Sequence, residues 1–253
     1  MRSVCVIPAR MGSSRFPGKP LAPLLGMPLI LHVWHRCRLF EPFERVVVAT
    51  CDREIADAAD VAGAETVMTA DTHERATDRT EEAISRLGLG LDDDDLVMMV
   101  QGDEVLTSPR MLADTVDAFG KADRPIVNLA SRLYSRADAE DPNTVKVVTA
   151  PDGRALYYSR SAIPSAARVA DPPVYQQTGI MGFRHGFLHR FSELAPTPLE
   201  KIESVDMMRV IEHGYEIQIT FTETETIGVD TPDELRRAEK RLEADPFTAR
   251  YLG

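Results

Sequence analysis

Short apolar runs that alternate with helical patterns constrain the fold of this chain more than any other feature. The runs are rich in β-branched residues and methionine and cover residues 3–8, 45–50, 66–68 and 96–100. Between and after them, apolar residues recur at helical spacing over residues 29–39, 55–62, 77–87 and 109–119. Strands that are apolar on both faces and separated by helices indicate a parallel sheet covered on both sides. We therefore predict an α/β fold with a Rossmann-like, mainly parallel sheet and helices on both faces.

The pattern changes after residue 124. Little helix separates the next strand-like segments, which cover residues 126–133, 145–149, 155–158 and 178–184. Helical and strand patterns then resume over residues 199–213, 217–221 and 232–244. We expect one domain over residues 1–253, made of a core over 1–124, a smaller β-rich insertion over 125–200 and a return to the core over 201–253.

Composition argues against several classes of protein. The net charge of -11 disfavours general binding to nucleic acid or anionic membranes, because such binding needs a basic face. No apolar run approaches the ~20 residues that span a membrane, and no signal-peptide pattern follows Met1. Cys5, Cys37 and Cys51 lack metal-ligand spacing, which favours a reduced, cytoplasmic protein. We expect no nucleic acid and no membrane among its partners.

The loop after the first apolar run gathers positive charge within this acidic chain. Its cations and small residues are Arg10, Gly12, Ser13, Ser14, Arg15 and Lys19. Backbone N–H groups in such a loop, backed by arginine and lysine, bind polyphosphates. The spacing matches neither the P-loop motif nor the dinucleotide-binding motif. The alternative is an ordinary strand-to-helix connection with surface cations.

Two carboxylates follow other predicted strands. Asp103 lies in the segment 101–104, directly after the run 96–100, and Asp230 precedes the last helix. Mg²⁺ favours one or two carboxylates together with substrate oxygens. If both side chains converge, they suit metal-assisted phosphoryl transfer. The alternatives are a turn closed by Asp103 and a helix cap formed by Asp230.

Five segments, in order along nearly the whole chain, carry a family resemblance. They are residues 9–21 (ARMGSSRFPGKPL), 101–104 (QGDE), 143–148 (NTVKVV), 155–164 (ALYYSRSAIP) and 228–232 (GVDTP). They resemble the CMP-Kdo synthetases, the 3-deoxy-manno-octulosonate cytidylyltransferases. The resemblance implies a CTP-dependent enzyme: an acceptor oxygen attacks the α-phosphorus, CMP joins the acceptor, and pyrophosphate leaves.

The resemblance also implies roles for individual residues. Catalysis would involve Arg15, Lys19 and Asp103, and Mg²⁺ would be held by Asp103 and Asp230. The nucleotide would be bound by Pro8, Ala9, Arg10, Gly12, Ser13, Ser14, Thr77, Arg79 and Gln101. The acceptor, a small anionic molecule, would be bound by Lys146, Arg160, Gln177, Met181, Glu203 and Asp206. The insertion would form the acceptor side and a dimer contact, so we expect a homodimer.

This chain departs from the family on the acceptor side. The family's His-Leu-Gly-Ile-Tyr-Gly-Tyr-Arg stands here as residues 177–184 (QTGIMGFR), and its Glu-Gln-Leu-Arg as residues 206–209 (DMMR). Gln177, Met181 and Met207 thus replace a ring nitrogen, a phenol and an amide that would bind sugar hydroxyls. Because losing such groups changes which acceptor is preferred, the acceptor pocket has diverged in chemistry.

Two interpretations of this divergence stay open. In the first, the acceptor is still Kdo or a related 2-keto sugar acid, held by other residues, and the methionines pack in the core. In the second, the acceptor is a phosphonate, and the product is a CMP-phosphonate. Rivals of a different kind are a non-catalytic nucleotide-binding protein and an enzyme that uses another nucleotide. Retention of Arg15, Lys19, Asp103 and Asp230 together argues against a non-catalytic protein.

Overall fold

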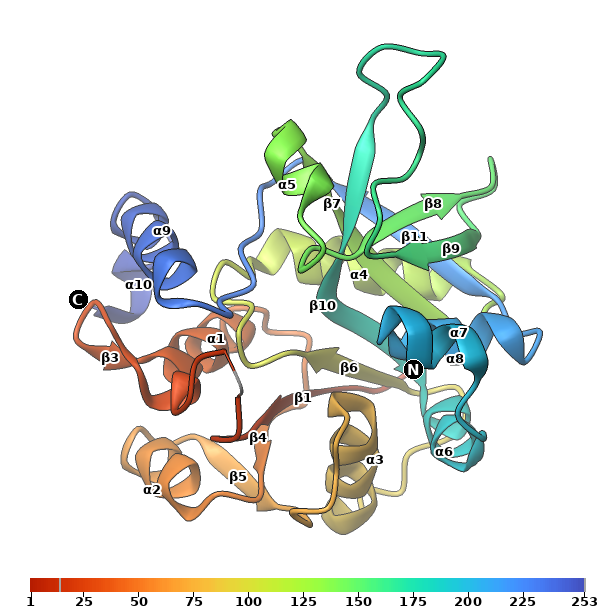
Figure 1. Ribbon diagram of the computed structural model, residues 1–253. Helices are drawn as coiled ribbons and strands as arrows, with labels where there is room; N and C mark the ends of the chain where they lie inside the picture. Colours follow the sequence, from red (N-terminus) through yellow and green to blue (C-terminus); the bar gives the residue numbers. More distant parts are fainter. Residues whose placement is uncertain (14, 253) are drawn as a thin grey trace.

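The computed structural model describes residues 1–13 and 15–252 and is built on a nine-stranded mixed sheet (Figure 1). The spatial order of the main strands is β11–β7–β10–β6–β1–β4–β5. Their bounds are β1 Ser3–Ala9, β4 Arg45–Thr50, β5 Glu65–Met68, β6 Leu96–Val100, β7 Ile126–Leu133, β10 Val174–Arg184 and β11 Ile217–Thr222. Strand β1 pairs in parallel with β4 and β6, and β11 pairs in parallel with β7. The predicted mainly parallel sheet is confirmed.

One antiparallel strand interrupts this arrangement. Strand β10 lies between β6 and β7 and runs antiparallel to both. Its first half also pairs with β8 (Lys146–Thr149), which in turn pairs with β9 (Ala155–Ser159). The connection from β9 to β10 extends away from the body of the molecule (Figure 1). These strands form the smaller β-rich part that the sequence predicts.

Helices cover both faces of the sheet, as predicted. One face packs against α1 (Leu29–Arg38), α2 (Arg53–Val61), α4 (Pro109–Lys121) and α9 (Pro232–Glu243). The other packs against α3 (Ala76–Leu87), α6 (His185–Glu193) and α8 (Asp206–Glu212). The remaining short elements are η1 Lys19–Leu21, β2 Pro23–Leu24, β3 Met27–Pro28, α5 Arg136–Glu140, α7 Pro198–Glu203 and α10 Ala249–Leu252.

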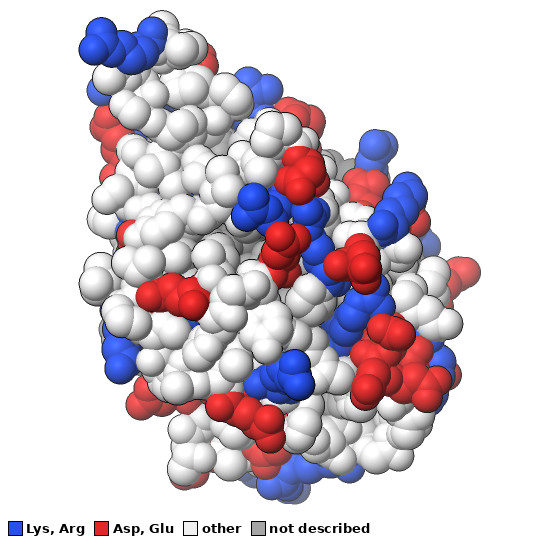
Figure 2. All heavy atoms as spheres, turned by 90° about the vertical axis from the view of Figure 1, so that its right-hand side faces the viewer, with Lys and Arg blue, Asp and Glu red and all other residues white. Residues whose placement is uncertain are grey.

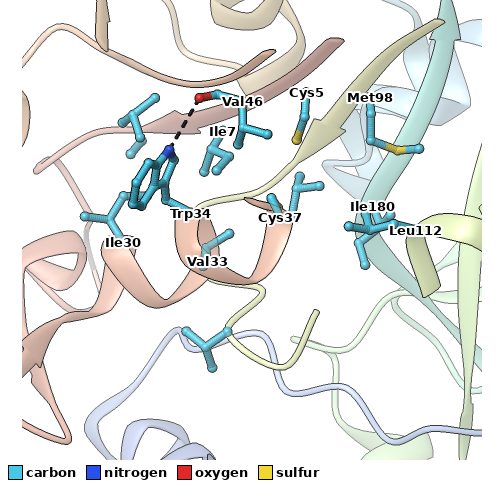
Figure 3. Close-up of a cluster of buried hydrophobic side chains, with 14 of the residues drawn as sticks. Cys5, Ile7, Ile30, Val33, Trp34, Cys37, Val46, Met98, Leu112 and Ile180 are labelled. Carbon is cyan, nitrogen blue, oxygen red and sulfur yellow. Dashed lines mark hydrogen bonds between the residues drawn. The ribbon is translucent and has the colours of Figure 1, made fainter. Parts of the chain in front are cut away.

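Strand β1 shows why its sequence is apolar from Val4 onward. Cys5 and Ile7 point into the core beside α1, while Val4 and Val6 point into the core on the other face. Side chains alternate across a strand, so a central strand covered on both sides has no solvent-facing position. Figure 3 shows the α1 side, where the Trp34 indole donates to the carbonyl of Val46 at 3.4 Å.

The predicted long helix over 199–213 is wrong in one respect. It is two helices, α7 and α8, separated at Ser204, whose φ of 53° is left-handed. The break makes Asp206 the first residue of α8. Two short helices, α5 and α6, were not expected.

The surface carries both signs of charge. On the face in Figure 2, acidic and basic side chains are interspersed. Among the described helices, none is both long enough and apolar enough to cross a bilayer.

Candidate active site

The segment 101–104 joins three parts of the chain at the carboxyl ends of β1 and β6. Gly102 N donates to Pro8 O at 3.3 Å, and Val229 N donates to Asp103 O at 3.2 Å. A Cβ on Gly102 would lie 3.0 Å from Pro8 O and 2.9 Å from a methyl carbon of Ile30, so this close approach requires glycine. The contacts bring the end of β1, Asp103 and the region of Asp230 together.

The loop after β1 is anchored beside this segment. Met11 N donates to the Asp52 carboxylate at 2.7 Å, and Gly18 N donates to Met11 O at 3.2 Å. Gly18 has a φ of 73°, a left-handed conformation that favours glycine, and it leads into η1, where Lys19 lies. The turn therefore aims Lys19 back at the strand ends.

Lys19 lies between two carboxylates that are far apart in the sequence. Its Nζ is 2.7 Å from Asp103 and 2.9 Å from Asp230. Arg15 adds a second cation, 2.6 Å from Asp230, and also donates to the Asn143 side chain at 2.9 Å. Burial acts to lower the pKa of Lys19, but the charges of Asp103 and Asp230 outweigh it and raise that pKa. Lys19 is therefore charged at neutral pH.

The same geometry tests whether a divalent cation fits. Both carboxylates converge on one positive charge, the ammonium of Lys19. Thr231, and not Asp230, caps α9 by accepting from Glu234 N, so the Asp230 carboxylate is not used as the helix cap. No group of three or more His, Cys, Asp or Glu within 1–13 and 15–252 could hold a metal on its own. Two carboxylates completed by substrate oxygens and water match the donor set of Mg²⁺.

Two adjoining cavities open at these strand ends. The loop cavity, of about 320 Å³, is lined by residues after β1, among them Pro8, Ala9, Arg10, Gly12, Ser13, Arg15 and Lys19. The large cavity, of about 1240 Å³, extends over β10 and the start of α8. Arg10, Arg15, Arg75, Gln101, Asp103 and Asp230 line both.

The predicted nucleotide-binding residues divide between these cavities. Arg79 and Gln101 line the loop cavity, and Thr77 lines the large cavity. Ser14 lies outside the described residues. Arg79 is 2% exposed and donates to Ala70 O at 3.3 Å and to the Thr69 hydroxyl. Its Nη2 is buried and finds no hydrogen-bond partner among the described atoms.

Four predicted acceptor residues line the large cavity: Arg160, Gln177, Met181 and Asp206. Both oxygens of Asp206 are already bound, one by Arg75 and one by the Thr77 hydroxyl at 2.9 Å. Arg75, which also pairs with Glu200 at 2.7 Å, is a cavity residue that the sequence reasoning missed. Its only signal was its place two residues before Thr77, next to the predicted nucleotide-binding residues Thr77 and Arg79.

Lys146 does not face an acceptor, contrary to the prediction. It is fully buried, and its Nζ donates to three backbone carbonyls, those of Asp141 (2.8 Å), Thr144 (2.6 Å) and Arg160 (2.6 Å). Three acceptors saturate an ammonium group, so this side chain fixes the turn around β8.

Glu203 is also bound within the protein. Its carboxylate accepts from the hydroxyls of Tyr157 and Ser159, both at 3.1 Å, and from Arg160 N at 2.9 Å. These bonds tie α7 to β9, and they correct the prediction that Glu203 binds the acceptor. The Arg160 guanidinium donates to backbone carbonyls, including that of Glu203 at 2.6 Å, although it lines the large cavity.

Glu104 adds an acid that is almost completely buried at the floor of the large cavity. It is 5% exposed, and its carboxyl accepts from Gly179 N at 2.5 Å. Burial raises the pKa of Glu104 to about 7, and the neighbouring charge of Asp103 adds to the shift.

The free energy of unfolding should therefore depend on pH through Glu104. Between its ordinary pKa of 4.5 and about 7, the folded chain holds a proton that the unfolded chain has released. Stability is then highest at low pH and falls by roughly 3 kcal/mol as pH rises through this window. Glu104→Gln should remove that fall. Denaturant titrations of both proteins in a metal chelator at several pH values measure it, and parallel curves would contradict the placement of this acid.

A comparison with known proteins identifies the chemistry of this site. A family model described as cytidylyltransferase matches residues 4–220. The chain belongs to the cytidylyltransferase family. This cytidylyltransferase is 39% identical over 247 residues to the 8-amino-3,8-dideoxy-manno-octulosonate cytidylyltransferase of Shewanella amazonensis. The match covers 97% of this chain and 100% of the relative. The enzyme of the same name from Shewanella sediminis is 38% identical over the same length.

Solved structures agree with this assignment. A CMP:2-keto-3-deoxy-manno-octonic acid synthetase complexed with CTP superposes with a TM-score of 0.87 at 33% identity, covering 96% of this cytidylyltransferase and 99% of that chain. A putative glucose-1-phosphate thymidylyltransferase from Bacillus anthracis, at 15% identity and a TM-score of 0.68, shares the fold. The predicted family and the predicted fold are both confirmed.

Proposed function

We propose that this cytidylyltransferase transfers CMP from CTP to a 2-keto sugar acid of the manno-octulosonate type and releases pyrophosphate. The observation that carries the proposal is the convergence of Lys19, Asp103 and Asp230 beside the loop after β1. The named relatives, which match almost end to end, support a manno-octulosonate acceptor.

The loop cavity suits the triphosphate. Arg10, Arg15 and Lys19 bring positive charge to it, and Arg79 lines it as well. The reaction forms a bond between an acceptor oxygen and the α-phosphorus and breaks the bond from that phosphorus to the leaving pyrophosphate. Charge therefore grows on the leaving group, where Lys19 and Arg15 stabilise it.

Asp103 and Asp230 would hold Mg²⁺. When bound, the metal would neutralise phosphate charge and orient the phosphate oxygens. Without any further partner, Lys19 already neutralises part of the negative charge of the two carboxylates. A triphosphate would compete with them for this ammonium. Lys19 would therefore pair with the carboxylates in the free enzyme and with the phosphates when the nucleotide is bound.

The large cavity has room for a sugar acid, with a volume of about 1240 Å³. Gln177 and Asp206 offer polar groups there, while Met181 and Met207 add an apolar wall. The named relatives favour an acceptor of the manno-octulosonate type over a small phosphonate. The phosphonate alternative is therefore not favoured.

We further propose a homodimer formed through the insertion and a cytoplasmic location. Leu156 on β9 is 45% exposed and Ile202 on α7 is 75% exposed. The hydrogen bond between Tyr157 and Glu203 ties these two elements together, so two exposed apolar side chains stand on neighbouring elements. The three cysteines are free, which fits a reducing compartment. Sedimentation velocity of the wild type and of Leu156→Glu, a substitution inside the insertion, tests the dimer: we expect a dimeric wild type and a weakened dimer in the variant, and a monomeric wild type would contradict the proposal.

An acceptor panel tests the proposed reaction. The enzyme is incubated with CTP, Mg²⁺ and one acceptor at a time: the 8-amino acid, the corresponding 8-hydroxy acid, or phosphonoformate. We expect pyrophosphate release with CTP and at least one sugar acid. We expect only background release when phosphonoformate replaces the sugar acid, or when ATP, GTP or UTP replaces CTP. Turnover of phosphonoformate alone would replace the proposed acceptor, and no turnover with any acceptor would favour a non-catalytic protein.

A further inference from the structure

Glu104 is a buried acid that the proposed reaction does not use. One carboxyl oxygen accepts from Gly179 N at 2.5 Å, and the other has no hydrogen-bond partner among the described residues. Burying a carboxyl group with one oxygen left without a partner costs free energy of folding. We therefore expect the single hydrogen bond of Glu104 to have a role in the site. That bond joins the end of β6 to the middle of β10.

Gly179 lies where β10 is irregular. The register of β10 against β7 shifts between Gln177 and Met181. Gln101 N donates to Gly179 O at 2.9 Å, and the Asn128 side chain donates to the carbonyls on either side of Gly179 at 3.1 Å each. The bulge is thus held on its carbonyl side by backbone and amide donors, and on its N–H side by Glu104.

The Gly179 backbone packs closely against the Gln101 side chain. A Cβ added to Gly179 would lie 2.7, 2.9 and 3.0 Å from the Cβ, Cγ and Cδ of Gln101. The position of the Gly179 backbone therefore limits where the Gln101 side chain can lie. Gln101 lines both the loop cavity and the large cavity, so its amide stands where the two substrates would meet.

We propose that Glu104 is a positioning residue: it holds the Gly179 bulge against Gln101 and so keeps the Gln101 amide at the boundary between the two cavities. Glu104 acts through its hydrogen bond to Gly179 N and not through contact with either substrate. An acceptor oxygen at this position is what the bulge needs, so glutamine can replace Glu104, and an apolar side chain of similar size cannot. This inference rests on the proposed function.

A double-mutant cycle tests the proposal. The rates compared are kcat/KM for CTP in the wild type, Glu104→Leu, Gln101→Ala and the double variant. We expect each single variant to lose on the order of 10-fold or more and the double variant to match Gln101→Ala within about twofold, because Glu104 has nothing left to position. Glu104→Gln should stay within about threefold of the wild type, because it keeps the acceptor for Gly179 N.

Asp95→Ala provides the matched control. Asp95 is 4% exposed, and its carboxylate accepts from two backbone N–H groups next to the other end of β6. The fold-loss in kcat/KM that Asp95→Ala causes should multiply with the fold-loss of Gln101→Ala in the double variant, as expected for a structural effect elsewhere in the sheet.

Three results would overturn the inference. They are multiplying losses for Glu104→Leu and Gln101→Ala, an unchanged rate in Glu104→Leu, and a Glu104→Gln variant as slow as Glu104→Leu. If Glu104→Leu does not fold, Glu104→Met takes its place, because a flexible thioether adapts to the same space. Failure of the proposed function would appear differently, as a wild-type enzyme that releases no pyrophosphate.

Discussion

Replacing Asp103 with alanine should abolish Mg²⁺-dependent turnover while leaving the fold intact. Asp103 is one of two carboxylates that converge on a single positive charge, and its loss would leave Asp230 as the one carboxylate for the proposed metal. Metal stabilisation of the transition state contributes several kcal/mol, so we expect kcat to fall by about 10³-fold or more. Pyrophosphate release measures the rate, and circular dichroism measures the fold.

Asp114→Ala is the control for this variant. Asp114 lies on α4, and its nearest cation is Arg110 of the same helix at 3.7 Å. Removing it changes the net charge by the same amount without touching the strand ends, so the rate should not change. Wild-type turnover in Asp103→Ala would remove the metal assignment.

Lys19→Ala should weaken the binding of CTP and slow the reaction together. Lys19 is the cation shared by Asp103 and Asp230. In the proposed reaction it also stabilises the pyrophosphate leaving group. We expect KM for CTP to rise and kcat to fall, each on the order of 10-fold or more, since charge-assisted bonds to the leaving group are strongest in the transition state.

The same variant should also change the response of the protein to metal. Without Lys19, the two carboxylates keep, among the described residues, only the ion pair between Arg15 and Asp230, so the metal-free protein should melt at a lower temperature. Mg²⁺ should restore part of that loss in Lys19→Ala and have less effect on the wild type. Lys121→Ala, at the end of α4, controls for net charge. An unchanged rate, nucleotide affinity and melting temperature in Lys19→Ala would refute its role.

The core of the fold is predictable because the hydrophobic pattern of its strands differs clearly from that of a helix. The run 96–100 is apolar at every position, which suits a strand buried on both faces. The sequence leaves open whether Asp103 and Asp230 converge. In the structure they do, joined by the bond from Val229 N to Asp103 O, although Asp230 follows the end of β11 only after the irregular segment 223–229.

The acceptor side is less predictable because tertiary contacts decide it. The sequence shows Lys146 as a cation inside a family segment, but three carbonyls surround its ammonium group, two from the turn 141–144 and one from Arg160 after β9. Glu203 likewise finds its partners on β9, more than forty residues away in sequence. Periodicity does not reveal such pairings, since they depend on how α7 packs on the small sheet.

Glu104 illustrates a further limit of sequence reasoning. It adjoins Asp103, and two neighbouring acids in one turn look alike in a sequence. The structure separates them by environment: Asp103 faces Lys19, while Glu104 turns inward to Gly179. Strand β10 makes the difference, because its antiparallel insertion between β6 and β7 brings Gly179 over the segment 101–104.

Phosphorus NMR of a complete reaction tests the central claim most directly. Wild-type enzyme, CTP, Mg²⁺ and a manno-octulosonate acid are mixed, and the phosphorus resonances are followed over time beside a sample of Asp103→Ala. The account predicts equimolar pyrophosphate and a CMP ester of the acid in the wild-type sample, and unchanged CTP in the variant. Pyrophosphate without a CMP ester, or intact CTP in the wild-type sample with both the 8-amino and the 8-hydroxy acid, would contradict it.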